Sequence, residues 1–168
     1  EEYIETQIMR PLSMDNSSVR QPVPEPQRSK LAQSYAFING SYRPISFAVD
    51  LMAPAGAMSA SATDMAHFML AHLQNGRYDS VRILGDAAAN RMHAQSFTHH
   101  PQLPGWAHGF QEMDINGRRV IFHDGSLQNY VSLMLLSPEN NLGLFVTYNS
   151  YDGGAALDEF LQAFFDRY

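Results

Sequence analysis

Residues 120–132 read Val-Ile-Phe-His-Asp-Gly-Ser-Leu-Gln-Asn-Tyr-Val-Ser, and they are the most informative segment of the sequence. An apolar run that is typical of a β-strand ends in His-x-Gly, and a second apolar run begins at Tyr130. We therefore expect a strand over Arg118–His123 and a neighbouring strand over Tyr130–Leu136. Two strands separated by a few polar residues favour antiparallel pairing.

Further elements extend this pair on both sides. Asn116-Gly117 is typical of a tight hairpin turn, so Gly109–Met113 is expected to pair with Arg118–His123. A turn at 137–141 leads to a fourth strand, Leu142–Tyr148. A helix follows Gly153-Gly154, and its apolar face holds Leu157, Phe160, Leu161, Phe164 and Phe165. The pattern predicts an α+β fold, with an antiparallel sheet, a packed C-terminal helix and a helical and loop region.

The first half of the chain predicts shorter elements. Residues 2–9 have helical spacing that Pro11 ends, and residues 15–30, with Pro22, Pro24 and Pro26, are expected to form an extended surface loop. Asn39-Gly40 favours a ribbon within residues 31–49. Ser61 and Asp64 favour the start of a helix that runs to about Gln74. A weaker helix is expected over 85–93 and a loop over 94–107.

Composition excludes several classes of function. The chain has 168 residues and a mass of 18.8 kDa, which corresponds to one domain or a large piece of one. A net charge of −6 with a single lysine, Lys30, argues against nucleic-acid binding. No apolar run approaches the roughly 18 residues that span a membrane. The absence of cysteine excludes disulfides but does not decide the compartment.

Four segments, taken in order, resemble the carboxy-terminal half of the serine β-lactamase and penicillin-binding-protein family. The segments are Ile8–Met14, Pro54–Phe68, Gly109-Phe110 and His123–Ser132, in which Ser13 and Asn129 replace glycines. The resemblance implies that residues 1–168 are the C-terminal part of one β-lactamase-like domain, without its N-terminal strands and nucleophile helix. It also suggests a periplasmic or secreted location.

The resemblance implies roles for six residues of the motif. His123, Gly125 and Ser126 are the expected catalytic positions: a hydrogen-bonding or cationic group, a glycine that lets substrate approach, and a backbone amide of the oxyanion hole. Asp124, Asn129 and Tyr130 are the expected substrate-binding positions. A carboxylate at Asp124 would repel an anionic substrate. Of the aromatic residues Trp106, Tyr130 and Tyr148, Tyr130 is the best candidate to line a pocket.

Two motifs of the family are absent from this sequence. The nucleophile motif Ser-x-x-Lys cannot occur, because Gln27 stands three residues before Lys30. No tyrosine or serine has asparagine two residues later. We therefore expect a part of a serine hydrolase that transfers acyl groups from small-molecule or peptide amides or esters and is inert by itself. The alternative is a non-catalytic, degenerate β-lactamase-like binding module.

No metal or cofactor is expected. His67 and His72 are five residues apart, and His99-His100 lies in a predicted loop, so no zinc-binding spacing occurs. Self-association is expected, because Leu142–Tyr148 would present an unpaired edge without the N-terminal strands. The alternative is that Glu1–Met9 folds back and covers that edge.

Overall fold

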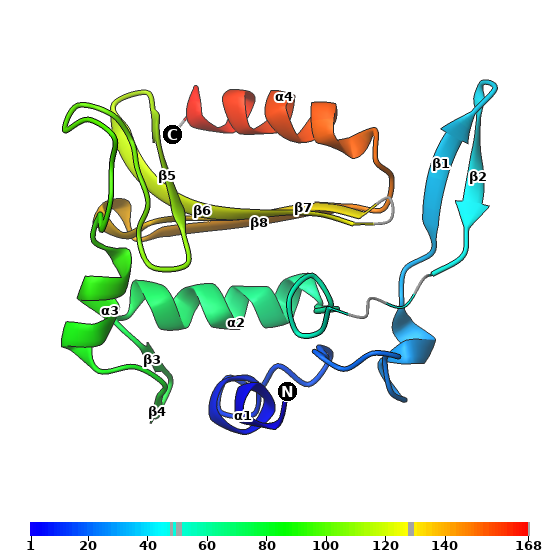
Figure 1. The fold of residues 1–168 in the computed structure, drawn as a ribbon, viewed down its shortest axis with the longest axis horizontal. Coiled ribbons are helices and arrows are strands. Elements are labelled where there is room, and N and C mark those ends of the chain that lie inside the picture. The colour runs from blue at the N-terminus through cyan, green and yellow to red at the C-terminus, as the bar shows by residue number, and fades with distance from the viewer. Residues whose placement is uncertain (48, 50–51, 128–129, 168) are drawn as a thin grey trace.

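The computed structural model describes residues 1–47, 49, 52–127 and 130–167. A four-stranded sheet lies between helix α4 (Gly153–Phe165) on one face and helix α2 (Ala62–Leu73) on the other (Figure 1). The short helix α1 (Glu2–Ile4) lies on the far side of α2. This layered arrangement confirms the predicted α+β fold.

The sheet is an antiparallel meander in the order β5-β6-β7-β8. Its strands are β5 (Gln111–Ile115), β6 (Arg118–Leu127), β7 (Tyr130–Ser137) and β8 (Leu142–Tyr148). Two predicted bounds were wrong. Strand β5 begins at Gln111, because Gly109 takes a φ of 79° and turns Phe110 into the core. Strand β6 continues four residues beyond His123, so the motif lies inside a strand.

The two faces of the sheet carry separate cores, because successive side chains of a strand point to opposite faces. On the α2 face, Ile121 and Leu136 are fully buried and pack with Met69 and Phe110. On the α4 face, Val120 and Leu135 are fully buried and pack with Leu157, Phe165 and their neighbours. The register pairs Ile121 with Leu136 and Gly125 with Ser132, so this alternation continues through the motif.

Helix α2 begins as the sequence predicts, with the Ser61 hydroxyl accepting a hydrogen bond from the Asp64 amide at 3.2 Å. Asp64 also has a long-range role. Its carboxylate is 1% exposed and accepts hydrogen bonds from the Asn16 amide at 2.8 Å and the Ser17 hydroxyl at 2.6 Å. The start of α2 is therefore tied to a loop 47 residues earlier in the chain.

The N-terminal segment packs on α2 and not on the sheet. Helix α1 continues as a π-helix, Glu5–Met9, and Met9 and Leu12 pack with Ala71 of α2. Strand β8 is the last strand of the sheet, and no described strand pairs with its outer edge. The alternative in which Glu1–Met9 covers that edge was therefore wrong for the described residues.

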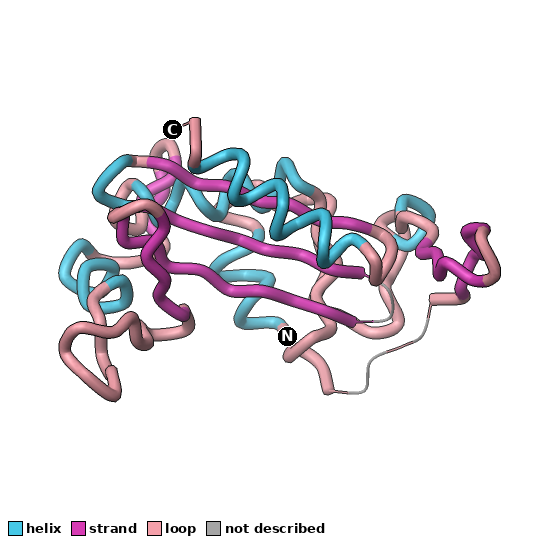
Figure 2. Tube along the Cα trace, turned by 90° about the horizontal axis from the view of Figure 1, so that it is seen from above, coloured by secondary structure: helices cyan, strands magenta, loops and turns pink. Residues whose placement is uncertain are grey.

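Shorter elements complete the chain. The predicted Asn-Gly ribbon is confirmed as β1 (Ser34–Ile38) and β2 (Ser41–Ile45), a hairpin that stands away from the sheet at one end of the molecule (Figures 1 and 2). The predicted helix near 85–93 is α3 (Asp86–His93). The others are β3 (Arg77–Tyr78), β4 (Val81–Arg82) and two 3-10 turns, Arg28–Lys30 and Pro138–Asn140. No helix of the described residues is both long enough and apolar enough to cross a membrane.

Candidate active site

The exposed half of β6 holds the motif. His123 is exposed, and its Nδ1 lies 2.7 Å from the carbonyl oxygen of Asp124. A carbonyl oxygen can only accept, so Nδ1 carries the proton and donates it. In the neutral imidazole, Nε2 is then the unprotonated nitrogen and is available to accept or relay a proton.

Alternation along β6 separates the motif side chains. His123 pairs with Met134 and lies on the α2 face, as do Gly125 and its partner Ser132. Asp124 lies on the α4 face, where its Oδ1 is 3.4 Å from the Gln111 Nε2 that donates to it. The structure therefore does not bring the Asp124 carboxylate beside His123, and the expected repulsion of an anionic substrate has no geometric support.

Ser126 also has its side chain on the α4 face. It lines a shallow hollow of about 460 Å³ with Val131 and with residues at the start of α4, namely Tyr151, Asp152, Gly154 and Ala155. The role expected of Ser126 depends on its backbone amide alone, so the direction of its side chain leaves that role possible. Asn129, the remaining expected substrate-binding residue of the turn, lies outside the described residues.

A side chain at Gly125 would be too close to Ser132 on the adjacent strand β7. A Cβ at this position would lie 2.9 Å from the Ser132 Oγ, which is closer than real Cβ contacts allow. The glycine therefore keeps the surface of the α2 face low between His123 and Ser132. A substrate that lies along this strand meets backbone and not side chain at Gly125.

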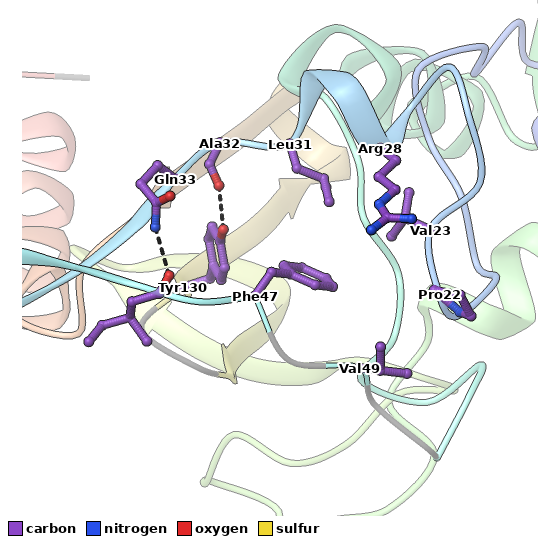
Figure 3. Close-up of a pocket in the computed structure, with 10 residues that line it drawn as sticks. Pro22, Val23, Arg28, Leu31, Ala32, Gln33, Phe47, Val49 and Tyr130 are labelled. Atoms are coloured by element: carbon purple, nitrogen blue, oxygen red, sulfur yellow. Dashed lines mark hydrogen bonds between the residues drawn. The ribbon is translucent and has the colours of Figure 1, made fainter.

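Tyr130 lines a cavity of about 310 Å³ next to the motif (Figure 3). Its hydroxyl donates a hydrogen bond to the carbonyl oxygen of Ala32, 98 residues earlier. The Phe47 ring meets the Tyr130 ring edge-on, with centroids 6.4 Å apart. The Tyr35 amide donates to the Asn149 carbonyl at 2.8 Å, which fixes the base of the β1–β2 hairpin beside the same end of the sheet. The full lining is Pro22, Val23, Arg28, Leu31, Ala32, Gln33, Ile45, Phe47, Val49 and Tyr130.

Most of this lining was missed from the sequence. Residues 15–30 were expected to form an extended surface loop, yet Val19 and Val23 are buried, at 2% and 3% exposure. Proline-rich composition signals extended backbone but not the direction in which the loop folds. Arg28 and Phe47 therefore carried no sequence signal of a shared cavity.

The family model for Beta-lactamase matches residues 1–164. The chain belongs to the Beta-lactamase family. The predicted resemblance is thereby confirmed over nearly the whole sequence. No curated protein matches the chain.

Solved structures with the same fold are longer than this family member. SurE has a TM-score of 0.80 and 21% identity, over 99% of this chain and 39% of that one. The D-amino acid amidase from Ochrobactrum anthropi SV3, complexed with D-phenylalanine, has a TM-score of 0.71 and 20% identity, over 99% and 54%. The octameric penicillin-binding protein homologue from Pyrococcus abyssi has a TM-score of 0.69 and 19% identity, over 90% and 34%. The chain thus spans about a third to a half of these structures' lengths.

This Beta-lactamase family chain also holds a buried pair of histidines. His72 Nδ1 and His93 Nε2 lie 2.9 Å apart, and the Phe110 ring packs edge-on against His72 at 5.5 Å. Burial lowers the pKa of His72 to about 4, with a further contribution from His93. Burial and the charge of Arg119 lower the pKa of His93. Sequence spacing had compared His72 with His67 and did not reveal His93 as its partner.

Arg119 and Glu112 form an ion pair beside the buried histidines. The Arg119 guanidinium donates to the His93 carbonyl at 2.6 Å and to the carboxylate of Glu112. Glu112 loses solvation by burial, which raises its pKa, but hydrogen bonds from Arg119, Gln95 and the Gly105 amide outweigh this and lower it. The described residues contain no group of three or more histidine, cysteine or acidic side chains that could hold a metal ion.

Proposed function

We propose that this chain forms one wall of the active site of a serine hydrolase that acts by acyl transfer on amide or ester substrates. The observation that carries the proposal is the motif, where His123 and Gly125 of β6 and Ser132 of β7 share the α2 face beside the Tyr130 cavity. Membership of the Beta-lactamase family supports it. The proposed activity concerns the protein that holds the whole domain, because fold alone does not determine function.

Each motif residue has a proposed task. The His123 Nε2 accepts or relays a proton, or binds an anionic group of the substrate when the ring is protonated. Gly125 lets the acyl group lie against the strand backbone. The Ser126 amide donates one of the two hydrogen bonds that stabilise the oxyanion of the tetrahedral intermediate. Tyr130 forms part of the surface that receives the substrate.

The nucleophile and its base are not among the 168 residues, because Ser-x-x-Lys does not occur. A serine hydroxyl needs an activating base to attack a carbonyl at neutral pH. We therefore propose that the chain by itself is inert. Purified chain should hydrolyse nitrocefin and p-nitrophenyl acetate at the buffer rate, and turnover that survives repurification would contradict the inertness.

The complete coding sequence gives the decisive test of the hydrolase. If it carries Ser-x-x-Lys and Tyr-x-Asn upstream, its product should form a covalent acyl adduct with a penicillin or an active ester, detectable by intact mass. The matched control replaces the motif serine by alanine and should show no adduct. A product that carries both motifs, folds, and forms no adduct with either reagent would exclude the proposed reaction for those substrates.

The second candidate is a non-catalytic binding module of the same family. The formed cavity at Tyr130 favours it, because such a cavity can bind a ligand without a nucleophile. A coding sequence without Ser-x-x-Lys and Tyr-x-Asn, whose product binds ligand in the cavity and forms no adduct, would select this candidate.

A further inference from the structure

We propose that the Tyr130 cavity binds a substrate side group that is apolar and ends in a carboxylate, and that Arg28 pairs with the carboxylate. In calling the ligand a substrate, this rests on the proposed function. The binding itself rests on three features of the cavity, which are its apolar wall, the charged side chain of Arg28 and the position of Tyr130 at the start of β7.

The wall of the cavity suits a ring or a branched alkyl group. Leu31, Phe47 and Val49 present carbon surface to the cavity, and Figure 3 shows the Phe47 ring beside that of Tyr130. Phe47 is 39% exposed although it is a large apolar side chain. Covering it with a ligand removes apolar surface from water, which favours binding.

Arg28 is the only charged residue among the described residues that line the cavity. Its side chain, drawn as sticks in Figure 3, makes no hydrogen bond or ion pair with the described part of the chain. The nearby cations differ, because Lys30 donates to the Asn16 side chain at 2.6 Å and Arg20 pairs with Glu5. A guanidinium with unused donors at an apolar wall matches a carboxylate in charge and shape.

The other polar side chains of the lining are already engaged. The Tyr130 hydroxyl donates to the Ala32 carbonyl, and the Gln33 Nε2 donates to the Ile45 carbonyl at 2.6 Å, as the dashed lines of Figure 3 mark. These bonds hold the two sides of the cavity together. The anionic group of a ligand is therefore left to Arg28.

The cavity is close enough to the motif for one ligand to reach both. Tyr130 pairs with Leu127 and stands two residues before Ser132, the partner of Gly125. Two residues of a strand span about 7 Å. A side group long enough to span this distance can therefore occupy the cavity while the scissile bond lies along Gly125.

The test measures binding to the 168-residue chain by calorimetry or NMR titration, without turnover. The probes are 3-phenylpropionate, its neutral amide 3-phenylpropanamide, and 3-phenylpropylamine. We expect the acid to bind about fivefold more tightly than the amide, which is the size of an exposed charge pair. Arg28→Gln should abolish this preference, and Arg28→Glu should reverse it in favour of the amine.

The matched control is Arg77→Gln, another exposed arginine without a side-chain partner in the described residues. It should keep the preference of the unchanged chain, and thermal unfolding should show that each variant is folded. Phe47→Ala should weaken the acid and the amide equally. Equal affinity for acid and amide, a preference that survives Arg28→Gln, or no binding of any probe would each overturn the inference.

The outcomes also separate this inference from the proposed reaction. Acid-selective binding that depends on Arg28, in a protein whose complete form makes no acyl adduct, would refute the hydrolase and leave the pocket. An acyl adduct in the complete protein, without Arg28-dependent selectivity, would refute the pocket and leave the hydrolase.

Discussion

The α2 side of the sheet holds histidines in two opposite environments. His72 and His93 are buried against Phe110, while His123, two residues beyond the fully buried Ile121, is exposed. Burial holds the first pair neutral, and exposure leaves the His123 ring open to a substrate. The difference shows that solvent exposure, and not residue type, determines which histidine a substrate can reach.

The largest expected effect is a loss of folding stability in acid, caused by the buried pair His72 and His93. The pKa of His72 is about 4 in the folded chain and 6.5 as its ordinary value. The unfolded chain binds more protons between these values, so the free energy of unfolding falls as the pH drops from about 6.5 to 4. His72 alone accounts for about 3 kcal/mol. The lowered pKa of His93 acts in the same direction.

Urea unfolding at several pH values between 4 and 7.5 measures this slope. His72→Gln should reduce it, whatever its stability at pH 7, and the exposed His108→Gln should not. Equal slopes in the unchanged chain and in His72→Gln would mean that the pair does not control the acid response.

The exposed His123 should affect the catalytic rate of the proposed hydrolase and not the folding stability. In the complete hydrolase, His123→Ala should lower kcat/KM by about tenfold or more, which corresponds to about 1.4 kcal/mol of transition-state stabilisation. Unfolding of the 168-residue chain should change little, because His123 is exposed and its recorded bond is to the adjacent residue. Unchanged kinetics would remove His123 from the site.

A smaller effect is expected at Gly125, which is half-buried in β6. Gly125→Ala places a methyl group 2.9 Å from the Ser132 Oγ and should cost about 1 kcal/mol of stability. Ser132→Ala removes the obstacle, so the double variant should recover most of this loss. A cost that persists fully in the double variant would place the constraint in the backbone and not in Ser132.

The open edge of β8 gives the smallest effect, a shift in association. We expect the chain to form dimers at micromolar concentration, since an unpaired edge favours pairing between chains. Thr147→Lys adds a charge at an exposed position of that strand and should lower the dimer fraction severalfold in light scattering. A purely monomeric 18.8 kDa species would contradict this expectation.

The meander and α4 could be predicted because each element has a local cause. Alternating apolar residues, the Asn116-Gly117 turn and the spacing of Leu157 and Leu161 act within a few residues, and the structure confirms them. The end of β6 could not be predicted. Asp124 to Leu127 lack a run of apolar side chains, and their place in the strand comes from pairing with Tyr130 to Leu133.

The cavity depended on contacts between distant parts of the chain. Arg28 and Tyr130 are about 100 residues apart in the sequence, and no pattern relates them. The same holds for Asp64, whose helix-start position was predicted but whose buried bonds to the Asn16 amide and Ser17 were not. Spacing within a motif therefore located His123 and Gly125, whereas the surroundings that give them a pocket required the tertiary structure.

The meander has a kinetic consequence. All its strand pairs join neighbours in the chain, so each pairing closes a short loop at low entropic cost and favours rapid folding of residues 111–148. The bond from Tyr130 to Ala32 spans 98 residues and must wait for a much larger closure. The sheet can thus form before the cavity does. Formation of β-structure should therefore be observed early in folding, and the ability to bind a ligand in the cavity should appear last.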